Sequence, residues 1–164
     1  MRSLIPHHVM MILAIFFFMS CTISLAHEVC SPKEFLDVHN QARAEVGVGP
    51  LSWNHNLEAY AQNYADLRSH DCNLEHSNGP YGENIAEGYG EMKDADAAKL
   101  WFAEKPNYDP QSNSCVNDEC LHYTQMVWRD SVHLGCAKSK CNNGWVFVVC
   151  NYDPPGNYVG DRPY

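Results

Sequence analysis

The sequence has few basic residues. Its 164 residues include 11 Lys and Arg against 20 Asp and Glu, which gives a formal net charge of −9. Basic runs, low-complexity segments and internal repeats are all missing. Anionic partners, such as nucleic acids and acidic membrane surfaces, attract proteins of the opposite charge balance. The composition therefore disfavours both kinds of partner.

Long apolar runs are nearly missing too. The one such run, residues 9–19, is shorter than the roughly 20 residues that a membrane-spanning helix needs. Arg2 before it and the small residues that end at Ala26 are typical of a secretory signal peptide. We expect residues 1–26 to be removed, and a membrane anchor is the less favoured alternative.

The remaining residues, 27–164, have the length of a single domain, which we expect to include a C-terminal tail at 154–164. Without Arg2 this part has 10 basic and 20 acidic side chains, and therefore a net charge of −10. Since it has no second apolar run, we expect no membrane span. The expected product is a soluble, secreted monomer.

Cys-x-x-Cys pairs, which are typical of zinc sites, do not occur among the eight cysteines. Cys21 belongs to the expected signal peptide, and export favours disulfides among the other seven. An odd number leaves one cysteine over, and we expect this to be Cys30. A tolerated surface thiol is the favoured interpretation, with a glutathionylated or intermolecular cysteine as the alternatives.

The pairing of the other six cysteines follows in part from turn residues. The Asn-Asn-Gly sequence at 142–144 predicts a hairpin that places Cys136 opposite Cys150. Cys115 and Cys120 can close a short local loop. That leaves Cys72 and Cys141 as a long-range pair. The expected disulfides are Cys72–Cys141, Cys115–Cys120 and Cys136–Cys150.

Hydrophobic periodicity and turn residues predict a mixed α and β fold. Ser31, Pro32 and Glu34 indicate a helix start with a capping box, and residues 47–50 end that helix. The apolar run 146–149 favours a central strand buried on both faces. The order of elements predicts an α+β sandwich, with a small sheet between layers of helices. Further helices are expected at 56–68 and 94–104, a short helix or turn at 121–128, strands at 82–86, 134–141 and 145–152, and a loop at 107–117.

Several phrases, in a fixed order, resemble a known family. They are Leu36-Asp37-Val38-His39-Asn40-Gln41-Ala42-Arg43, Leu51-Ser52-Trp53, Gly82-Glu83-Asn84-Ile85, His122-Tyr123-Thr124-Gln125-Met126-Val127-Trp128 and Cys150-Asn151-Tyr152-Asp153-Pro154. They resemble the plant pathogenesis-related protein 1 family, within the CAP superfamily (cysteine-rich secretory proteins, antigen 5, pathogenesis-related). The resemblance covers the whole chain after residue 26. It implies a three-layer α-β-α sandwich, the same disulfide pattern and a defence role in the apoplast. Cys30 departs from the family pattern.

The resemblance assigns the family's His/Glu tetrad to His76, Glu83, Glu104 and His122. Two imidazoles and two carboxylates in one cleft can bind a divalent metal such as zinc, or do acid–base work if their pKa values differ. The alternative is structural, since opposed Glu and His side chains can simply pair and fasten loops across the sheet. Ser77 is adjacent to His76, but no oxyanion-hole signature is visible, so no catalytic residue is assigned.

Members of the superfamily bind sterols, and the resemblance places the relevant feature in the aromatic-bearing loop after the third helix. That loop contains Pro106 and Tyr108, and Trp101 lies on the helix before it. A sterol needs an apolar cleft with one polar group for its hydroxyl, and Tyr108 can supply both a ring and a phenol. In the alternative interpretation, Tyr108 packs on Trp101 as ordinary core.

The tail resembles a segment that plant members release as a defence-signalling peptide. Cleavage between Asp153 and Pro154 would free residues 154–164. Two prolines and a glycine disfavour regular structure there, which favours access by a protease. The alternative is a surface tail whose aromatic side chains pack on the domain.

We therefore expect a secreted, non-enzymatic defence protein that sequesters a sterol or another lipid and requires no cofactor. The first alternative is the precursor of a C-terminal signalling peptide, with a protease as its partner. The second is a metal-dependent hydrolase that uses the tetrad with a divalent metal such as zinc.

Overall fold

The structure is a computed structural model that describes residues 31–164. The expected signal peptide and Cys30 lie outside the described residues. The helices are α1 (Pro32–Glu45), α2 (His55–Arg68), α3 (Asp94–Phe102) and α4 (Leu121–Met126), with a 3₁₀ turn at Lys105–Asn107. The strands are β1 (Ser52–Trp53), β2 (Gly82–Tyr89), β3 (Tyr108–Asp109), β4 (Ser114–Cys115), β5 (His133–Lys140) and β6 (Trp145–Asp153).

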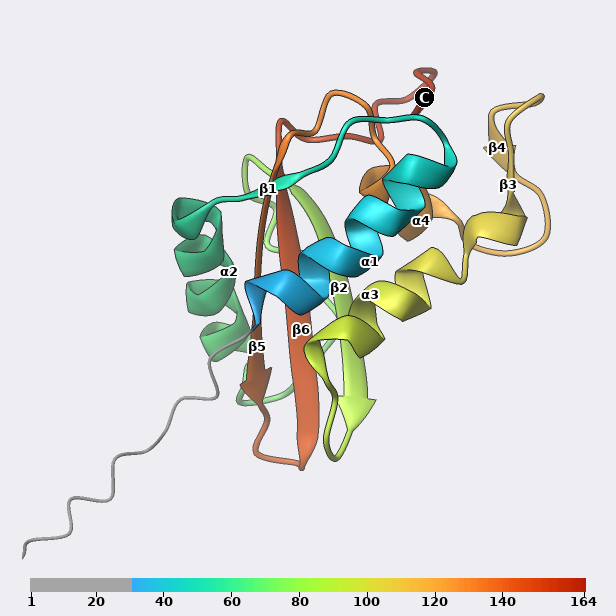
Figure 1. Cartoon of the computed structure of the whole chain (residues 1–164). Coiled ribbons are helices and arrows are strands. Elements are labelled where there is room, and N and C mark those ends of the chain that lie inside the picture. The colour runs from blue at the N-terminus through green and yellow to red at the C-terminus, as the bar shows by residue number, and fades with distance from the viewer. Residues whose placement is uncertain (1–30) are drawn as a thin grey trace, which may run out of the picture.

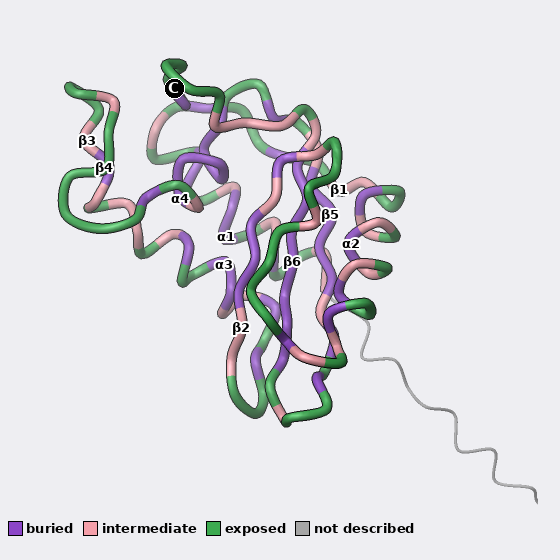
Figure 2. Tube along the Cα trace, turned by 180° about the vertical axis from the view of Figure 1, so that it is seen from behind, coloured by how far each residue is buried: buried purple, intermediate pink, exposed green. Residues whose placement is uncertain are grey.

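A four-stranded sheet in the order β1-β5-β6-β2 forms the middle layer. β1 is parallel to β5, and the other pairs are antiparallel. Helix α2 covers one face of the sheet, while α1, α3 and α4 cover the other (Figure 1). The predicted three-layer α-β-α sandwich is confirmed. β6 is the central strand that its apolar run predicts, and Figure 2 shows it buried along most of its length.

Two hydrophobic cores follow from the alternation of side chains along β6. Val148 and Tyr152 face the larger core, under α1, α3 and α4. Phe147 and Val149 face the smaller core, under α2. Because both faces of the strand are covered, its sequence reads as a continuous apolar run rather than an alternating one.

The start of α1 differs from the expected capping box. Ser31 is the N-cap residue and Pro32 opens the helix as predicted, but the Ser31 side chain makes no capping hydrogen bond. The backbone N–H of Ser31, which Glu34 would accept in a capping box, donates instead to the carboxylate of Asp94 on α3. A tertiary contact between two helices therefore replaces the local one.

The end of α1 follows the sequence closely. Gly47 adopts a φ of +73°, the left-handed conformation in which a residue with a side chain is strained. Its N–H bonds to Ala44 O, and the N–H of Val48 bonds to Arg43 O. These bonds satisfy carbonyls that the helix end leaves free, and they turn the chain toward β1.

Residues 107–117 are not the simple loop that was expected. β3 and β4 pair in a two-stranded ribbon, Tyr108 opposite Cys115, which projects from the domain (Figure 1). Asp109 organises its turn by accepting hydrogen bonds from the backbone N–H groups of Gln111 and Ser112. We call residues 108–115 the ribbon.

All three expected disulfides are present. The sheet register places Cys136 directly opposite Cys150, as the turn at 142–144 predicts. Cys115–Cys120 ties the ribbon to the start of α4. Cys72–Cys141 joins the segment after α2 to the hairpin, across 69 residues of sequence.

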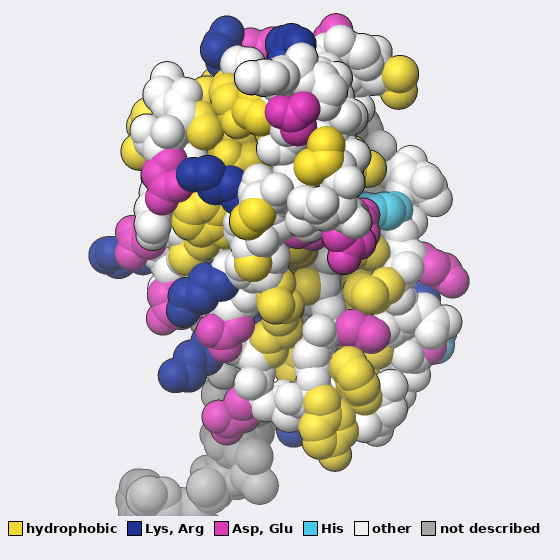
Figure 3. Space-filling model, turned by 90° about the vertical axis from the view of Figure 1, so that its right-hand side faces the viewer, with side chains coloured by type: hydrophobic (Ala, Val, Ile, Leu, Met, Phe, Trp, Pro, Cys, Tyr) yellow, Lys and Arg dark blue, Asp and Glu magenta, His cyan; other side chains and the backbone are white. Residues whose placement is uncertain are grey.

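The surface mixes charges of both signs. On the side from which the ribbon projects, Lys and Arg side chains are interleaved with Asp and Glu (Figure 3). In the part of the chain that the structure describes, no helix has the length and apolar character to cross a membrane.

Candidate functional site

Glu83, near the start of β2, holds the preceding segment against the sheet. Its Oε1 accepts from His76 Nδ1 and from the N–H of Ser77, both at 2.8 Å. Its Oε2 accepts from the Ser77 hydroxyl at 2.5 Å and from Asn151 Nδ2 at 3.2 Å. The hydroxyl of Ser77 is thus directed to the same carboxylate that His76 binds.

These bonds set the ionisation of the pair. Burial by itself raises the pKa of the Glu83 carboxyl, but the hydrogen bonds from His76, Ser77 and Asn151 outweigh burial and lower the pKa. The bond to Glu83 in turn raises the pKa of His76. The Glu83 side chain is 6% exposed and that of His76 54%, so the ring lies at the surface.

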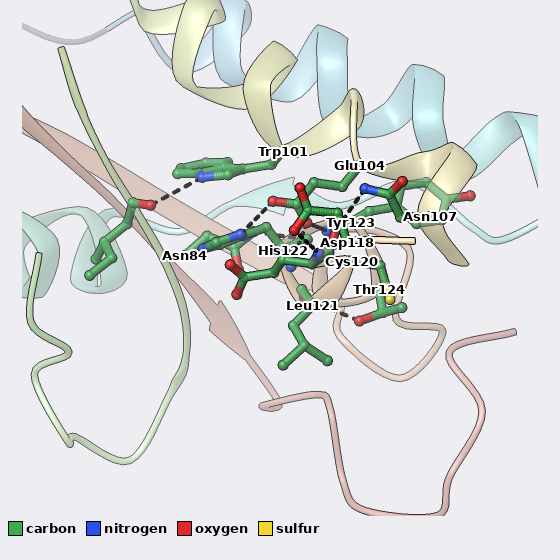
Figure 4. A network of polar contacts seen from close by, with 12 residues as sticks. Asn84, Trp101, Glu104, Asn107, Asp118, Cys120, Leu121, His122, Tyr123 and Thr124 are labelled. Atoms are coloured by element: carbon green, nitrogen blue, oxygen red, sulfur yellow. Dashed lines mark hydrogen bonds and ion pairs between the residues drawn. The ribbon is translucent and has the colours of Figure 1, made fainter. Parts of the chain in front are cut away.

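Glu104, just after α3, holds the start of α4. Its Oε1 is 2.6 Å from His122 Nδ1, and its Oε2 accepts from the N–H groups of His122 and Tyr123 at 3.0 and 3.1 Å. N–H groups in the first turn of a helix have no partner within the helix, and this carboxylate supplies one. The His122 ring also stacks on Trp101, with centroids 6.2 Å apart (Figure 4).

A buried network links the two pairs. Asn84, next to Glu83 on β2, donates to the carbonyl of His122 and to the hydroxyl of Tyr152, both at 3.0 Å. The same hydroxyl lies 2.8 Å from Nε2 of His39. Burial lowers the pKa of His39 to about 4, so the ring is neutral at ordinary pH. The tetrad is therefore present as two His–Glu pairs joined through polar groups of the core.

Each tetrad imidazole has one feature of a zinc-binding histidine. Its Nδ1–H is held by a carboxylate, which directs Nε2 toward any ligand. Within residues 31–164, however, no three His, Cys, Asp or Glu side chains are grouped so that they could hold a metal ion. Two imidazole nitrogens are fewer than the three or four protein ligands of the usual zinc sites. The described side chains therefore do not form a complete zinc site.

A pocket of about 260 Å³ lies between the ribbon, α4 and the tail. The ribbon contributes Tyr108 and residues 113–115, and the tail contributes residues 157–161 and Pro163. The other lining residues are Cys120, Leu121, Thr124 and Trp128, on α4 and directly beside its two ends. We call this cavity the ribbon–tail pocket.

Of the three residues expected to bind lipid, Tyr108 lines this pocket. The residue is 8% exposed, and its ring contacts Tyr123 and Tyr164, with centroid distances of 6.4 and 5.9 Å. Burial raises the pKa of the Tyr108 phenol, which stays protonated and donates to Asn113 Oδ1 at 2.9 Å. Trp101 lies in the larger core, where its Nε1 donates to Ile85 O, and Pro106 is exposed on the 3₁₀ turn.

The tail is irregular in backbone but is attached to the domain along its length. Ser131 Oγ donates to Pro154 O at 2.7 Å, and the N–H of Gly156 donates to Gln125 Oε1 at 3.0 Å. A side chain at Gly156 would meet the ring of Trp128, so only glycine allows the tail to lie this close. Near the C-terminus, the N–H of Arg129 donates to Pro163 O at 2.7 Å.

The expected cleavage junction lies where β6 meets the tail. Asp153 is the last residue of β6, pairs with His133 and accepts a hydrogen bond from the N–H of Val132, while Pro154 is exposed. The peptide bond between Asp153 and Pro154 is cis. Because the flanking residues are held on both sides, the tail has to leave the domain before a protease can bind it in an extended form.

Sequence reasoning missed the buried polar residues that organise this region. Arg43, on the apolar face of α1, is 1% exposed and donates to backbone carbonyls at the end of α4 and beyond it. Asn84 and Asn151 are buried in strands. The one signal in the sequence is that each interrupts an apolar pattern, and a polar residue in such a place needs hydrogen-bond partners.

Comparisons with known proteins agree with this architecture. The chain matches the model of the CAP family, described as the cysteine-rich secretory protein family, over residues 36–152. The basic form of pathogenesis-related protein 1 from Nicotiana tabacum is 57% identical over 134 residues, 82% of this chain and 76% of that protein.

Two solved structures share the fold. Venom allergen-like protein 4 of Schistosoma mansoni is 30% identical, with a TM-score of 0.64 over 80% of this chain and 92% of that chain. The crystal structure of NaASP2 with Zn²⁺ is 26% identical, with a TM-score of 0.66 over 83% and 90% of the two chains. On the family model, the identity to the tobacco protein and the shared fold, this chain belongs to the CAP family and is a pathogenesis-related protein 1 relative.

Proposed function

We propose that this protein is secreted to the plant apoplast and acts in defence by binding a sterol or another lipid in the ribbon–tail pocket. Kinship with a pathogenesis-related protein supports the defence role. The disulfides support secretion, since such bonds persist in oxidising compartments.

The observation that carries lipid binding is the composition of the pocket wall. Tyr108, Trp128 and Tyr158 supply aromatic rings, while Asn113 and Thr124 supply polar groups beside them. An apolar cleft with a few polar groups is what a sterol, with one hydroxyl on an apolar body, requires.

The size of the pocket defines how much of the ligand it holds. Pockets for drug-sized ligands span roughly 300–1,000 Å³, and the ribbon–tail pocket has about 260 Å³. We therefore propose that it encloses one end of a sterol, and that the rest of the ligand lies against the surface.

Binding of radiolabelled cholesterol to purified protein of residues 27–164 tests the proposal. We expect saturable binding that Tyr108→Ala weakens at least about tenfold, through loss of the ring from the pocket wall. Tyr108→Phe keeps the ring and removes only the phenolic hydroxyl. It is the second variant to test if the alanine variant does not fold. Tyr89→Ala, which changes a tyrosine that is 75% exposed and lies outside the pocket, is the matched control. Absence of saturable binding in the unmodified protein would rule sterol sequestration out.

Zinc binding at the tetrad is a second candidate. The carboxylate-held imidazoles of His76 and His122 favour it, and a protein of the same fold has been crystallised with Zn²⁺. With two nitrogens from the protein, water or another molecule would complete the coordination.

Titration calorimetry with zinc tests this candidate. We expect His76→Gln or His122→Gln to weaken zinc binding about tenfold or more, because each removes one of two ligands. His55→Gln is the matched control, since His55 also bonds a glutamate but on α2, outside the tetrad. Equal zinc affinity in all these variants would exclude the tetrad as the zinc site.

A further inference from the structure

The tail is a wall of the ribbon–tail pocket. Residues 157–161 and Pro163 line it on one side, and the ribbon and α4 line it on the other. The Tyr158 ring contacts Trp128, with centroids 6.2 Å apart, so one aromatic pair joins the tail to the segment just after α4. If the tail leaves the domain, the pocket loses this wall and becomes an open surface.

The tail is attached by contacts outside the pocket as well as within it. Ser131 holds its start through Pro154 O, and Arg162 holds its end by donating to Pro110 O and Gln111 O on the ribbon. Neither Ser131 nor Arg162 lines the pocket. Attachment of the tail can therefore be weakened without changing a residue that a bound molecule would touch.

We propose that ligand binding in the ribbon–tail pocket and attachment of the tail stabilise one another. The proposal rests on the lipid binding proposed above. A molecule in the pocket contacts both walls, so it binds the attached form better than the open form. Linkage then requires that the ligand shifts the tail toward the attached form, and that loss of the tail releases the ligand.

The coupling has a consequence for the bond between Asp153 and Pro154. The tail must leave the domain before this bond becomes accessible, and a bound ligand opposes that opening. An occupied pocket therefore keeps residues 154–164 on the domain, and an empty pocket lets them open more often.

Hydrogen exchange of residues 154–164, measured by mass spectrometry on protein of residues 27–164, tests the coupling. At a cholesterol concentration ten times the Kd, we expect exchange in the tail to slow about tenfold. In the double variant Ser131→Ala with Arg162→Ala, exchange without ligand should be faster, by roughly fivefold for each hydrogen bond lost. Cholesterol should slow it again. The double variant Ser69→Ala with Lys33→Ala removes a serine bond and a surface cation away from the tail, and is the control.

The outcomes separate the coupling from lipid binding itself. If cholesterol binds but tail exchange is unchanged or faster, the coupling is wrong and the proposed function survives. If the Ser131/Arg162 variant binds cholesterol normally while its tail exchanges as an unprotected chain, the coupling is also wrong. If cholesterol does not bind at all, the sterol binding proposed above fails and the coupling fails with it.

Discussion

At the scale of single residues, the buried His39 controls part of the pH response. Its Nδ1–H donates to Phe35 O, which leaves Nε2 to accept from the hydroxyl of Tyr152. A charged ring would have two N–H donors and no acceptor, and would have to be buried without a counter-charge. The network that links α1 to the tetrad therefore depends on a neutral His39.

Acid should destabilise the fold through this residue. The pKa of His39 falls from 6.5 to about 4 on folding. Between these values the unfolded chain binds a proton that the native chain does not, so the free energy of unfolding decreases as the pH falls. The total loss is roughly 3 kcal/mol. Urea denaturation at several pH values should show this slope, and His39→Gln should flatten it. An unchanged slope in the variant would contradict a neutral His39.

His76 acts in the opposite direction. Its pKa is raised on folding, so its bond to Glu83 stabilises the native state fully below pH 6.5 and less as the pH rises through the raised value. Comparison of His39→Gln and of His76→Gln with the unmodified protein at matched pH separates the effects of the two histidines.

At the scale of elements, Arg43 connects α1 to the segment that follows α4. Its guanidinium donates to the carbonyls of Met126, Trp128 and Ser131 at 3.1, 2.7 and 2.8 Å. Desolvation lowers the pKa of Arg43 to about 10, and the group remains charged at neutral pH. The same segment supplies Trp128 to the pocket lining and Ser131 and Arg129 to the attachment of the tail, so a residue on α1 shapes a site that it does not line.

Replacement of Arg43 should lower the free energy of unfolding. Arg43→Met fills much of the same volume but leaves several buried carbonyls without donors, and we expect a loss of roughly 3–5 kcal/mol in the free energy of unfolding. Arg129→Met changes an exposed arginine and should stay within about 0.5 kcal/mol of the unmodified protein. Guanidinium denaturation measures both, and a loss below about 1 kcal/mol for Arg43→Met would show that water satisfies these carbonyls.

The sequence was sufficient to predict elements whose signals are local. The long helices, the hairpin and its disulfide follow from periodicity and from one turn at 142–144, as the register of Cys136 opposite Cys150 shows. Interactions between distant segments were missed. The N–H of Ser31 bonds to Asp94, 63 residues away, where a local capping box was expected. The ribbon was missed because its strands, at Tyr108 and Cys115, are only two residues long.

The candidate site, like the fold, was predictable only in part. The resemblance named the tetrad residues, but not that Glu104 would support α4 while Glu83 supports the segment before β2. Each role depends on backbone N–H groups, which leave no trace in the sequence. For the same reason, nothing in residues 154–164 indicated that they would line a pocket.

At the scale of the whole molecule, the disulfides differ in the length of the loop that each one closes. In the chain-entropy picture, Cys72–Cys141 closes 69 residues and stabilises by roughly 4 kcal/mol, while Cys115–Cys120 closes five and contributes about 2 kcal/mol. The first holds the fold together across the layer under α2. The second holds the ribbon in place beside the pocket.

The placement of the tryptophans gives the protein a built-in optical reporter. Of the four in the chain, Trp128 alone lines the ribbon–tail pocket, and its indole contacts Tyr158 and Gly156 of the tail. Trp53 packs near Phe35, and Trp145 pairs with Tyr89 at the start of β6. Indole emission depends on local polarity. Its wavelength in a protein that retains only Trp128 would therefore follow the wetting of the pocket in real time, without any added dye.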